Sequence, residues 1–199
     1  MDKGKIIVIS GPSGVGKGTV IKELMARHPR IQYSVSATTR SIRPDEIPDV
    51  SYHFLTKEQF EAMLAEDAFL EHALYSTNYY GTPAKPVFDW IEQGDDVIVE
   101  VEVQGGYQIK ERRDDAIMIF ITAPSFEELE RRLRGRGDTP EDMIQLRLKT
   151  AREEYRKAVN YDYIVCNDEV GRVTNEILTI LAAEESRAGR RVHLIKEAF

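Results

Sequence analysis

A glycine-rich segment that ends in a lysine lies near the N-terminus of the 199-residue sequence. Residues 11–17, Gly-Pro-Ser-Gly-Val-Gly-Lys, match the spacing G-x-x-x-x-G-K. Glycines at these positions let several backbone N–H groups converge on one phosphate, and the lysine can reach the outer phosphates of a nucleoside triphosphate. The segment predicts a nucleotide-binding loop whose contacts come from Gly11, Ser13, Gly14, Val15, Gly16, Lys17, Gly18 and Thr19.

The residues on either side of this loop predict a strand and a helix. Residues 5–10 contain the β-branched, continuously apolar run Ile6-Ile7-Val8-Ile9, which is typical of a strand buried on both faces in a parallel sheet. From residue 17 onward, apolar side chains recur at helical spacing until Pro29 stops the pattern. A phosphate-binding loop requires this context, because the first turn of the helix adds a partial positive charge.

The residue that follows Lys17 departs from the usual phosphate-binding loop. Gly18 stands where a serine or threonine hydroxyl normally meets Mg²⁺, and Thr19 follows one position later. Mg²⁺ commonly keeps several water ligands. We therefore expect Mg²⁺ to be held mainly by phosphates and water, with help from Thr19 or Glu100.

A second segment, residues 34–44, is rich in hydroxyl groups and carries Arg40 and Arg43. Within it, residues 36–43 read S-x-T-T-R-x-x-R. With the G-P-S-G-x-G-K loop before it and Tyr-Tyr-Gly-Thr at residues 79–82 after it, the sequence resembles guanylate kinases over roughly residues 5–168. The resemblance implies a P-loop enzyme that moves the γ-phosphate of ATP to GMP, with Mg²⁺ present.

The resemblance also implies a GMP site made of Ser36, Arg40, Arg43, Tyr52, Glu71, Tyr80, Gly81, Thr82, Glu100 and Glu102. The planar fork of an arginine pairs with phosphate oxygens, and tyrosine hydroxyls can donate to them as well. Glu71 can accept from guanine N1–H and its amino group, whereas adenine has no N1–H. The alternative is that the arginines are solvated loop residues, the tyrosines ordinary aromatic residues and Glu71 a surface carboxylate.

Glu100 and Glu102 lie in a segment, residues 97–103, that alternates as a strand does. This pattern predicts that both carboxylates share one face of the strand. The resemblance implies that Glu100 lies near Mg²⁺ and Glu102 near GMP, although aspartate is usual in the family's acidic pair. Strand carboxylates that face solvent are the alternative.

The charged segment from residue 125 to 156 contains R-L-x-G-R-G followed by R-L. On pattern alone it predicts solvated helices with ion pairs such as Glu128 with Arg132. The resemblance implies a mobile lid over ATP, with Asn167 beside adenine. It implies that phosphoryl transfer is catalysed by Lys17, Arg40, Arg43, Arg132, Arg136 and Arg147.

The remaining periodicity predicts helices at residues 57–70, 83–93, 125–134, 140–156 and 173–183, with strands at 116–121 and 161–166. Thr56 is the expected N-cap of the first of these helices. The expected fold class is α/β, with a three-layer P-loop core around a mainly parallel sheet, an inserted α+β subdomain and a helical lid. We expect the core to comprise residues 1–34, 84–125 and 158–199, the GMP-binding subdomain 35–83 and the lid 126–157.

The composition excludes several other classes of protein. With 42% hydrophobic and 31% charged residues, the chain is globular rather than disordered. A net charge of −7 argues against a partner that is a nucleic-acid polymer, and no apolar run reaches the length of a membrane span. Cys166 is the only cysteine, which favours a reducing compartment such as the cytoplasm. We expect a monomer or homodimer whose ligands are the small nucleotides GMP and ATP.

These observations predict an enzyme of purine nucleotide metabolism that phosphorylates GMP, and also dGMP, at the expense of ATP. Two alternatives remain. One is a non-catalytic module that binds phosphorylated peptides in the acceptor pocket, which the intact loop and lid arginines disfavour. The other is an adenylate-type kinase, which the Gly18-Thr19 departure slightly favours.

Overall fold

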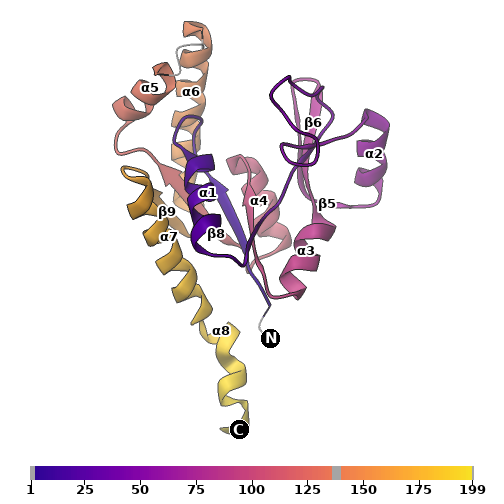
Figure 1. Cartoon of the computed structure of the whole chain (residues 1–199), viewed down its shortest axis with the longest axis vertical. Coiled ribbons are helices and arrows are strands. Elements are labelled where there is room, and N and C mark those ends of the chain that lie inside the picture. Colours follow the sequence, from indigo (N-terminus) through magenta and orange to yellow (C-terminus); the bar gives the residue numbers. More distant parts are fainter. Residues whose placement is uncertain (1–2, 136–139, 199) are drawn as a thin grey trace.

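The computed structural model describes residues 3–135 and 140–198. Its centre is a five-stranded sheet (Figure 1). The strand order is β2-β7-β1-β8-β9, and all pairs are parallel. The strands are β1 (Ile6–Ser10), β2 (Ile31–Tyr33), β7 (Asp96–Glu100), β8 (Ile117–Thr122) and β9 (Tyr163–Cys166). All five residues of β1 are buried because the strand lies in the middle of the sheet. The predicted parallel sheet is confirmed.

Helices cover both faces of this sheet. They are α1 (Lys17–Arg27) and α7 (Val170–Glu185) on one face, and α3 (Ala84–Glu92) and α4 (Val103–Arg112) on the other. Two clusters of buried apolar side chains, one on each face, fill the space between sheet and helices. The predicted three-layer α/β core is therefore confirmed.

A smaller four-stranded sheet lies beside the core, ordered β4-β3-β6-β5. It consists of β3 (Ala37–Thr38), β4 (His53–Phe54), β5 (Phe69–Tyr75) and β6 (Asn78–Pro83), and α2 (Lys57–Ala65) packs against it. The rings of Phe60 and Phe69 stack with centroids 4.3 Å apart and join α2 to β5. Thr56 caps α2 as predicted, in a reciprocal pair of hydrogen bonds with Gln59.

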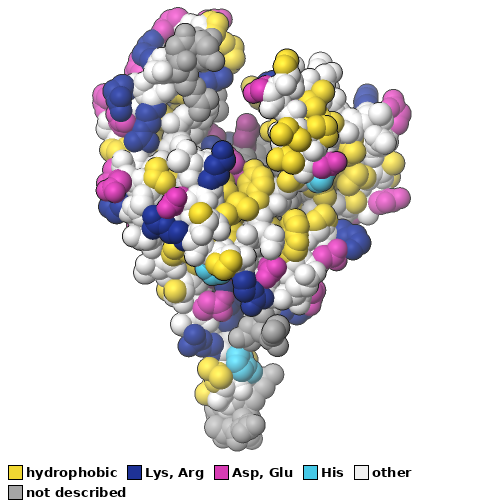
Figure 2. Space-filling model, in the orientation of Figure 1, with side chains coloured by type: hydrophobic (Ala, Val, Ile, Leu, Met, Phe, Trp, Pro, Cys, Tyr) yellow, Lys and Arg dark blue, Asp and Glu magenta, His cyan; other side chains and the backbone are white. Residues whose placement is uncertain are grey.

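Two helices form an arm on the opposite side of the molecule, α5 (Phe126–Arg134) and α6 (Glu141–Lys157). Ser125 caps α5 by accepting from the N–H of Glu128. Figure 2 shows a hollow between this arm and the arm that carries the smaller sheet. The chain ends with η1 (Ala158–Asn160), then β9 and α7, and finally α8 (Ala188–Arg191) and η2 (Val192–Ala198), which extend away from the hollow (Figure 1).

Two predicted elements differ from the structure. The helix predicted for residues 57–70 ends at Ala65, because Asp67 adopts a left-handed φ of 51° and the chain then enters β5. The strand predicted for residues 97–103 ends at Glu100, and Val103 begins α4, for which no helix was predicted. Gly105 and Gly106 weaken the helical signal of α4, while packing of Val103 and Ile109 in the core stabilises it.

Because β7 ends at Glu100 and α4 begins at Val103, the carboxylates of Glu100 and Glu102 lie elsewhere than the strand prediction placed them. Glu100 ends β7 and Glu102 is the N-cap residue of α4, so the two carboxylates do not share a strand face.

In the ranges 3–135 and 140–198, no helix has the length and apolarity needed to cross a membrane. The division into core, GMP-binding subdomain and lid stays a prediction.

Candidate active site

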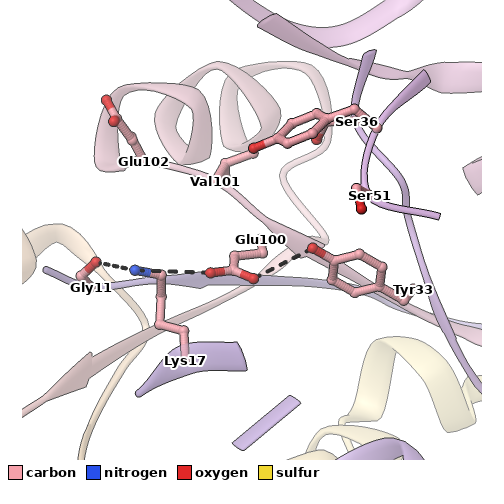
Figure 3. Close-up of a pocket in the computed structure, with 9 residues that line it drawn as sticks. Gly11, Lys17, Tyr33, Ser36, Ser51, Glu100, Val101 and Glu102 are labelled. Carbon is pink, nitrogen blue, oxygen red and sulfur yellow. Dashed lines mark hydrogen bonds and ion pairs between the residues drawn. The ribbon is translucent and has the colours of Figure 1, made fainter. Parts of the chain in front are cut away.

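The carboxyl ends of three neighbouring strands meet at one edge of the central sheet. β1 leads into Gly11, β7 ends at Glu100 and β2 ends at Tyr33, and Ile9 of β1 pairs with Glu100. In open α/β sheets, ligands bind outside this edge. A cavity of about 250 Å³ opens here, lined by Gly11, Lys17, Tyr33, Ser36, Ser51, Tyr52, Glu100, Val101 and Glu102 (Figure 3).

The loop between β1 and α1 has the conformation that its glycines predict. Gly14 and Gly16 have φ angles of 86° and 96°, a region that residues with a Cβ rarely adopt. A Cβ on Gly16 would lie 2.6 Å from Nδ2 of Asn167. Because α1 begins at Lys17, the free N–H groups of its first turn and the positive end of its dipole adjoin the loop. The arrangement can bind phosphate oxygens.

Lys17 lies at the centre of a chain of polar contacts across the cavity. Its Nζ donates to the carbonyl oxygen of Gly11 at 2.6 Å and lies 3.9 Å from Oε1 of Glu100 (Figure 3). On the far side, the hydroxyl of Tyr33 donates to Oε2 of Glu100 at 3.4 Å. Burial and the adjacent Glu100 raise the pKa of Tyr33 well above its usual range, so the hydroxyl stays protonated. Glu100 is thereby held between a cation and a hydroxyl donor.

Arg40 is held by a carboxylate that the sequence analysis did not single out. Nη2 and Nη1 of Arg40 donate to Oε1 and Oε2 of Glu46 at 2.7 and 3.0 Å. Hydrogen bonds from Arg40 and from the N–H of Arg43 lower the pKa of Glu46 to about 2. The guanidinium lies 5.4 Å from the ring centroid of Tyr52, and that ring meets Tyr80 edge-on at 6.1 Å. Arg40, Tyr52 and Tyr80 thus form one cluster.

The second arginine of this segment is less constrained. The side chain of Arg43 is exposed, and its backbone N–H donates to Oε2 of Glu46 at 2.8 Å. No hydrogen bond or ion pair joins its guanidinium to another residue within the described ranges. Arg43 therefore has its guanidinium N–H groups available for an anionic ligand.

Glu71 is a buried carboxylate in the smaller sheet. It lies opposite Thr82 in the pairing of β5 with β6, and the Thr82 hydroxyl donates to Oε1 of Glu71 at 2.7 Å. Burial raises the pKa of Glu71, and nearby Glu102 adds to the rise, while the Thr82 hydrogen bond opposes it. Gly81 is buried beside Thr82 in β6. The placement of Glu71 as a surface residue is therefore excluded.

Arg132 connects the α5–α6 arm to the loop. It donates to the carbonyl oxygen of Val15 at 3.3 Å, to that of Asn167 at 2.9 Å and to Oε1 of Glu128 at 2.7 Å. Asn167 in turn donates to the carbonyl oxygen of Val15 at 2.8 Å. Arg132, Val15 and Asn167 are thus brought together, and their contacts with a nucleotide stay a prediction.

The two other arginines of this arm are not part of that cluster. Arg147 lies half-buried on α6, and no polar contact of its guanidinium is found with another described residue. Arg136, which was predicted to close over ATP, lies outside the described residues. Their part in the site stays a prediction.

Comparison with known proteins decides the family. A family model described as guanylate kinase matches residues 3–184. The chain belongs to the guanylate kinase family. It is 44% identical to the guanylate kinase of Desulfitobacterium hafniense (strain Y51) over 97% of this chain and 96% of that protein, and 46% identical to that of Halalkalibacterium halodurans over 96% and 94%. The crystal structure of guanylate kinase from Anaplasma phagocytophilum matches with a TM-score of 0.78 and 32% identity, covering 98% of this chain and 95% of that one.

In this guanylate kinase family member, the cavity gathers six of the predicted residues, namely Gly11, Lys17, Ser36, Tyr52, Glu100 and Glu102. It also includes Tyr33 and Ser51, which sequence reasoning missed. Tyr33 reaches Glu100 only because β2 pairs with β7, and nothing in the local sequence specifies that pairing. Glu46 was missed as well, although a carboxylate three residues after Arg43 in an arginine-rich segment is a signal that could have identified it.

The oxygen donors near the loop suit Mg²⁺ only as part of a shell completed by other ligands. Oxygen ligands are what Mg²⁺ prefers, and it commonly binds one or two carboxylates plus phosphates and water. Glu100 lies at the cavity and Thr19 is exposed at the start of α1. Among residues 3–135 and 140–198, no group of three His, Cys, Asp or Glu side chains is placed to hold a metal ion. The residues present fit a largely phosphate-bound Mg²⁺.

Proposed function

We propose that this protein transfers the γ-phosphate of ATP to GMP, and also to dGMP, giving ADP and the nucleoside diphosphate. The observation that carries the proposal is the shared cavity, which has Gly11 and Lys17 of the phosphate-binding loop at one side and Ser36 and Tyr52 of the smaller sheet's segment at the other. Membership of the guanylate kinase family supports the same reaction.

The donor nucleotide is bound on the side of the loop. Backbone N–H groups between Gly11 and Lys17 surround the β- and γ-phosphates, and the first turn of α1 adds its partial charge. The ammonium of Lys17 exchanges its contact with Gly11 for the phosphate oxygens. Arg132, which already reaches Val15 at the loop, adds positive charge over the same phosphates. Mg²⁺ near Glu100 and Thr19 would supply further neutralisation of phosphate charge.

The acceptor is bound on the side of the smaller sheet. Arg40 and Arg43 hold the phosphate of GMP, with Tyr52 and Tyr80 as hydroxyl donors, and Glu71 accepts from the guanine. Phosphoryl transfer needs little covalent chemistry from the protein, so the rate comes from aligning the two nucleotides and neutralising charge. Closure of the two arms over the hollow would exclude water and limit hydrolysis of ATP.

A coupled assay that measures ADP release with GMP, dGMP, AMP and UMP in turn tests this function. We expect turnover with GMP and dGMP and at least about 100-fold lower kcat/KM with AMP, because adenine cannot donate from N1 to the Glu71 carboxylate. Equal use of AMP would identify an adenylate-type kinase instead. No turnover with any acceptor, despite binding of GMP, would refute an enzymatic function.

The Mg²⁺ hypothesis leads to a prediction for the position after Lys17. A Cβ on Gly18 would meet no atom within 4 Å, so Gly18→Ser is accommodated without strain. Because phosphates and water supply most ligands, we expect this change to move the half-saturating Mg²⁺ concentration by less than about threefold. We expect Glu100→Gln to raise it by about tenfold, since a carboxylate near the ion is lost.

The measurement is initial rate against Mg²⁺ concentration at saturating nucleotides, with Thr19→Ala as a third variant. The hypothesis fails if Gly18→Ser strongly increases activity at limiting Mg²⁺ while Thr19→Ala and Glu100→Gln change nothing.

The raised pKa of Glu71 predicts that the efficiency with which the protein uses GMP depends on pH in the acid range. Only the ionised carboxylate can accept from both guanine donors. Because burial raises the pKa of Glu71, the loss of the ionised form begins at a higher pH than for an exposed glutamate. We therefore expect kcat/KM for GMP to fall as pH is lowered through this raised pKa. The same shift means that ionised Glu71 lowers folding stability at neutral pH, an effect relieved as the carboxyl protonates.

The control is the pH profile of Glu71→Gln. Its side chain does not titrate, whereas the phosphates of the substrates titrate identically with both proteins, so the difference between the two profiles isolates Glu71. Parallel profiles for the two proteins between pH 4.5 and neutrality, about the range in which a raised carboxyl pKa acts, would contradict this role.

We also propose a cellular compartment and an oligomeric state for the protein. A single cysteine and a net charge of −7 are consistent with a cytoplasmic enzyme of purine nucleotide metabolism that binds small nucleotides rather than nucleic-acid polymers or membranes. We expect a monomer or homodimer. Light scattering at two protein concentrations measures the oligomeric state directly.

A further inference from the structure

Gly105 lies on the first turn of α4 at an unusually close approach to Glu71. A Cβ built on Gly105 would lie 2.8 Å from Oε2 of Glu71 and 3.2 Å from its Cδ. Carbon atoms in proteins do not stay that close to an unbonded oxygen, so the carboxylate can occupy its present position only because residue 105 has no side chain. Glycine is otherwise an unfavourable choice within a helix.

The other oxygen of the same carboxylate is also held. Oε1 of Glu71 accepts from the Thr82 hydroxyl at 2.7 Å. The carboxylate is therefore enclosed between β6, which donates a hydrogen bond, and α4, which approaches through the backbone of Gly105. The side chain of Glu71 is buried, so it has little free space into which it could move away from an added Cβ.

The neighbouring glycine has a different role. A Cβ on Gly106 would meet Oη of Tyr161 at 2.7 Å and Cε of Met118 at 3.0 Å, both on the core side of α4. Gly106 thus allows α4 to approach the central sheet, whereas Gly105 faces the Glu71 carboxylate. Gly106 therefore serves the packing of the helix, and Gly105 serves the placement of Glu71.

We propose that Gly105 is a positioning residue for guanine recognition. By having no side chain, it lets the Glu71 carboxylate lie against α4, at the position from which its oxygens can accept from N1–H and the 2-amino group of guanine. This inference rests on the proposed use of GMP. It makes residue 105 a determinant of the preference for guanine over purines that lack the 2-amino group, such as the hypoxanthine of IMP.

The test begins with the wild-type protein, assayed with GMP, IMP and ATP as variable substrates. Failure of wild type to use GMP would refute the proposed function, independently of residue 105. With GMP use established, Gly105→Ala is expected to raise the KM for GMP by about tenfold, because the displaced carboxylate loses one of its two contacts to guanine. The ratio of kcat/KM for GMP to that for IMP is expected to fall by a similar factor, with the KM for ATP within about twofold.

A second substitution in the same background distinguishes positioning from general damage. Glu71→Asp shortens the side chain by one methylene and makes room for a Cβ at residue 105. Alone it should weaken GMP use, but added to Gly105→Ala it should restore part of the lost kcat/KM. Glu111→Ala, an exposed position on the same helix, is the matched control and should leave all three substrates unaffected.

Three results would overturn the proposal. One is a folded Gly105→Ala protein with unchanged KM for GMP and an unchanged GMP to IMP ratio. Another is an equal rise in KM for GMP and ATP with no recovery in the double variant. If Gly105→Ala alone fails to fold, circular dichroism of the double variant decides: recovered folding supports the contact between residues 105 and 71, and continued failure to fold contradicts it.

Discussion

Replacing Lys17 with alanine is expected to lower kcat by about 10²–10³-fold, the effect of removing one preorganised charge donor from a phosphoryl or acyl transition state. The Nζ of Lys17 lies over the loop, bonded to the Gly11 carbonyl at 2.6 Å and 3.9 Å from Oε1 of Glu100. During transfer, negative charge redistributes over the phosphates that the loop surrounds, and a fixed ammonium stabilises that charge more than it stabilises bound ATP. The decrease should therefore appear mainly in kcat.

The same substitution should change folding stability little. Lys17 donates to the loop carbonyls of Gly11 and Pro12 and makes a distant, partly solvated contact with Glu100, and each contact of this kind contributes about 1 kcal/mol or less. Thermal unfolding and steady-state kinetics of the same preparation separate the two effects. Lys22→Ala, which removes an exposed lysine from the same helix, is the matched control and should retain activity. Unaltered turnover of Lys17→Ala would refute the assigned role.

Replacing Arg43 with alanine is expected to raise the KM for GMP by about 10- to 100-fold, which corresponds to the loss of about 1.5–3 kcal/mol from a charge-assisted hydrogen bond to phosphate. The guanidinium of Arg43 is exposed, and it makes no hydrogen bond or ion pair with another described residue, so its removal breaks no internal hydrogen bond. The KM for ATP should stay within about twofold, because the loop that binds ATP is untouched.

Arg43 is a cleaner choice for this experiment than Arg40. Arg40 is bonded through two nitrogens to Glu46, so Arg40→Ala would also release that carboxylate and loosen the segment that carries both arginines. Lys85→Ala removes one positive charge from an exposed site on α3 and controls for the change in net charge. Normal saturation by GMP in Arg43→Ala, measured by initial rates at fixed ATP, would contradict a phosphate-binding role for this residue.

Local signals predicted the donor side of the site well. The buried strand, the glycine loop and α1 were all found from residues 5–28, because each element is specified by its own residues: β-branched apolar runs, glycines at left-handed φ and helical periodicity. The N-cap Thr56 was likewise at its predicted position, since a cap involves residues only three apart. Family membership, predicted from short motifs, was confirmed by the matches along nearly the whole chain.

Predictions failed where neighbours distant in the sequence decide the structure. The strand signal of Val97, Val99, Val101 and Val103 continues past Glu100, but the chain turns there and α4 begins, because its apolar residues gain burial against the central sheet. The helix signal of α2 likewise continues into Phe69, which instead joins β5 and stacks on Phe60. In both cases tertiary packing outweighed local periodicity.

The sequence by itself determined a loop that can bind phosphates, and its resemblance to guanylate kinases predicted a pair of arginines for an acceptor phosphate and a carboxylate for guanine. Only the tertiary structure decided how these groups are held. Strand pairing placed Tyr33 against Glu100, the smaller sheet set Glu71 opposite Thr82, and the absence of a side chain on Gly105 left room for that carboxylate. The physical reason is that residue type and short spacing encode local conformation, whereas distances between segments follow from how the sheets and helices pack.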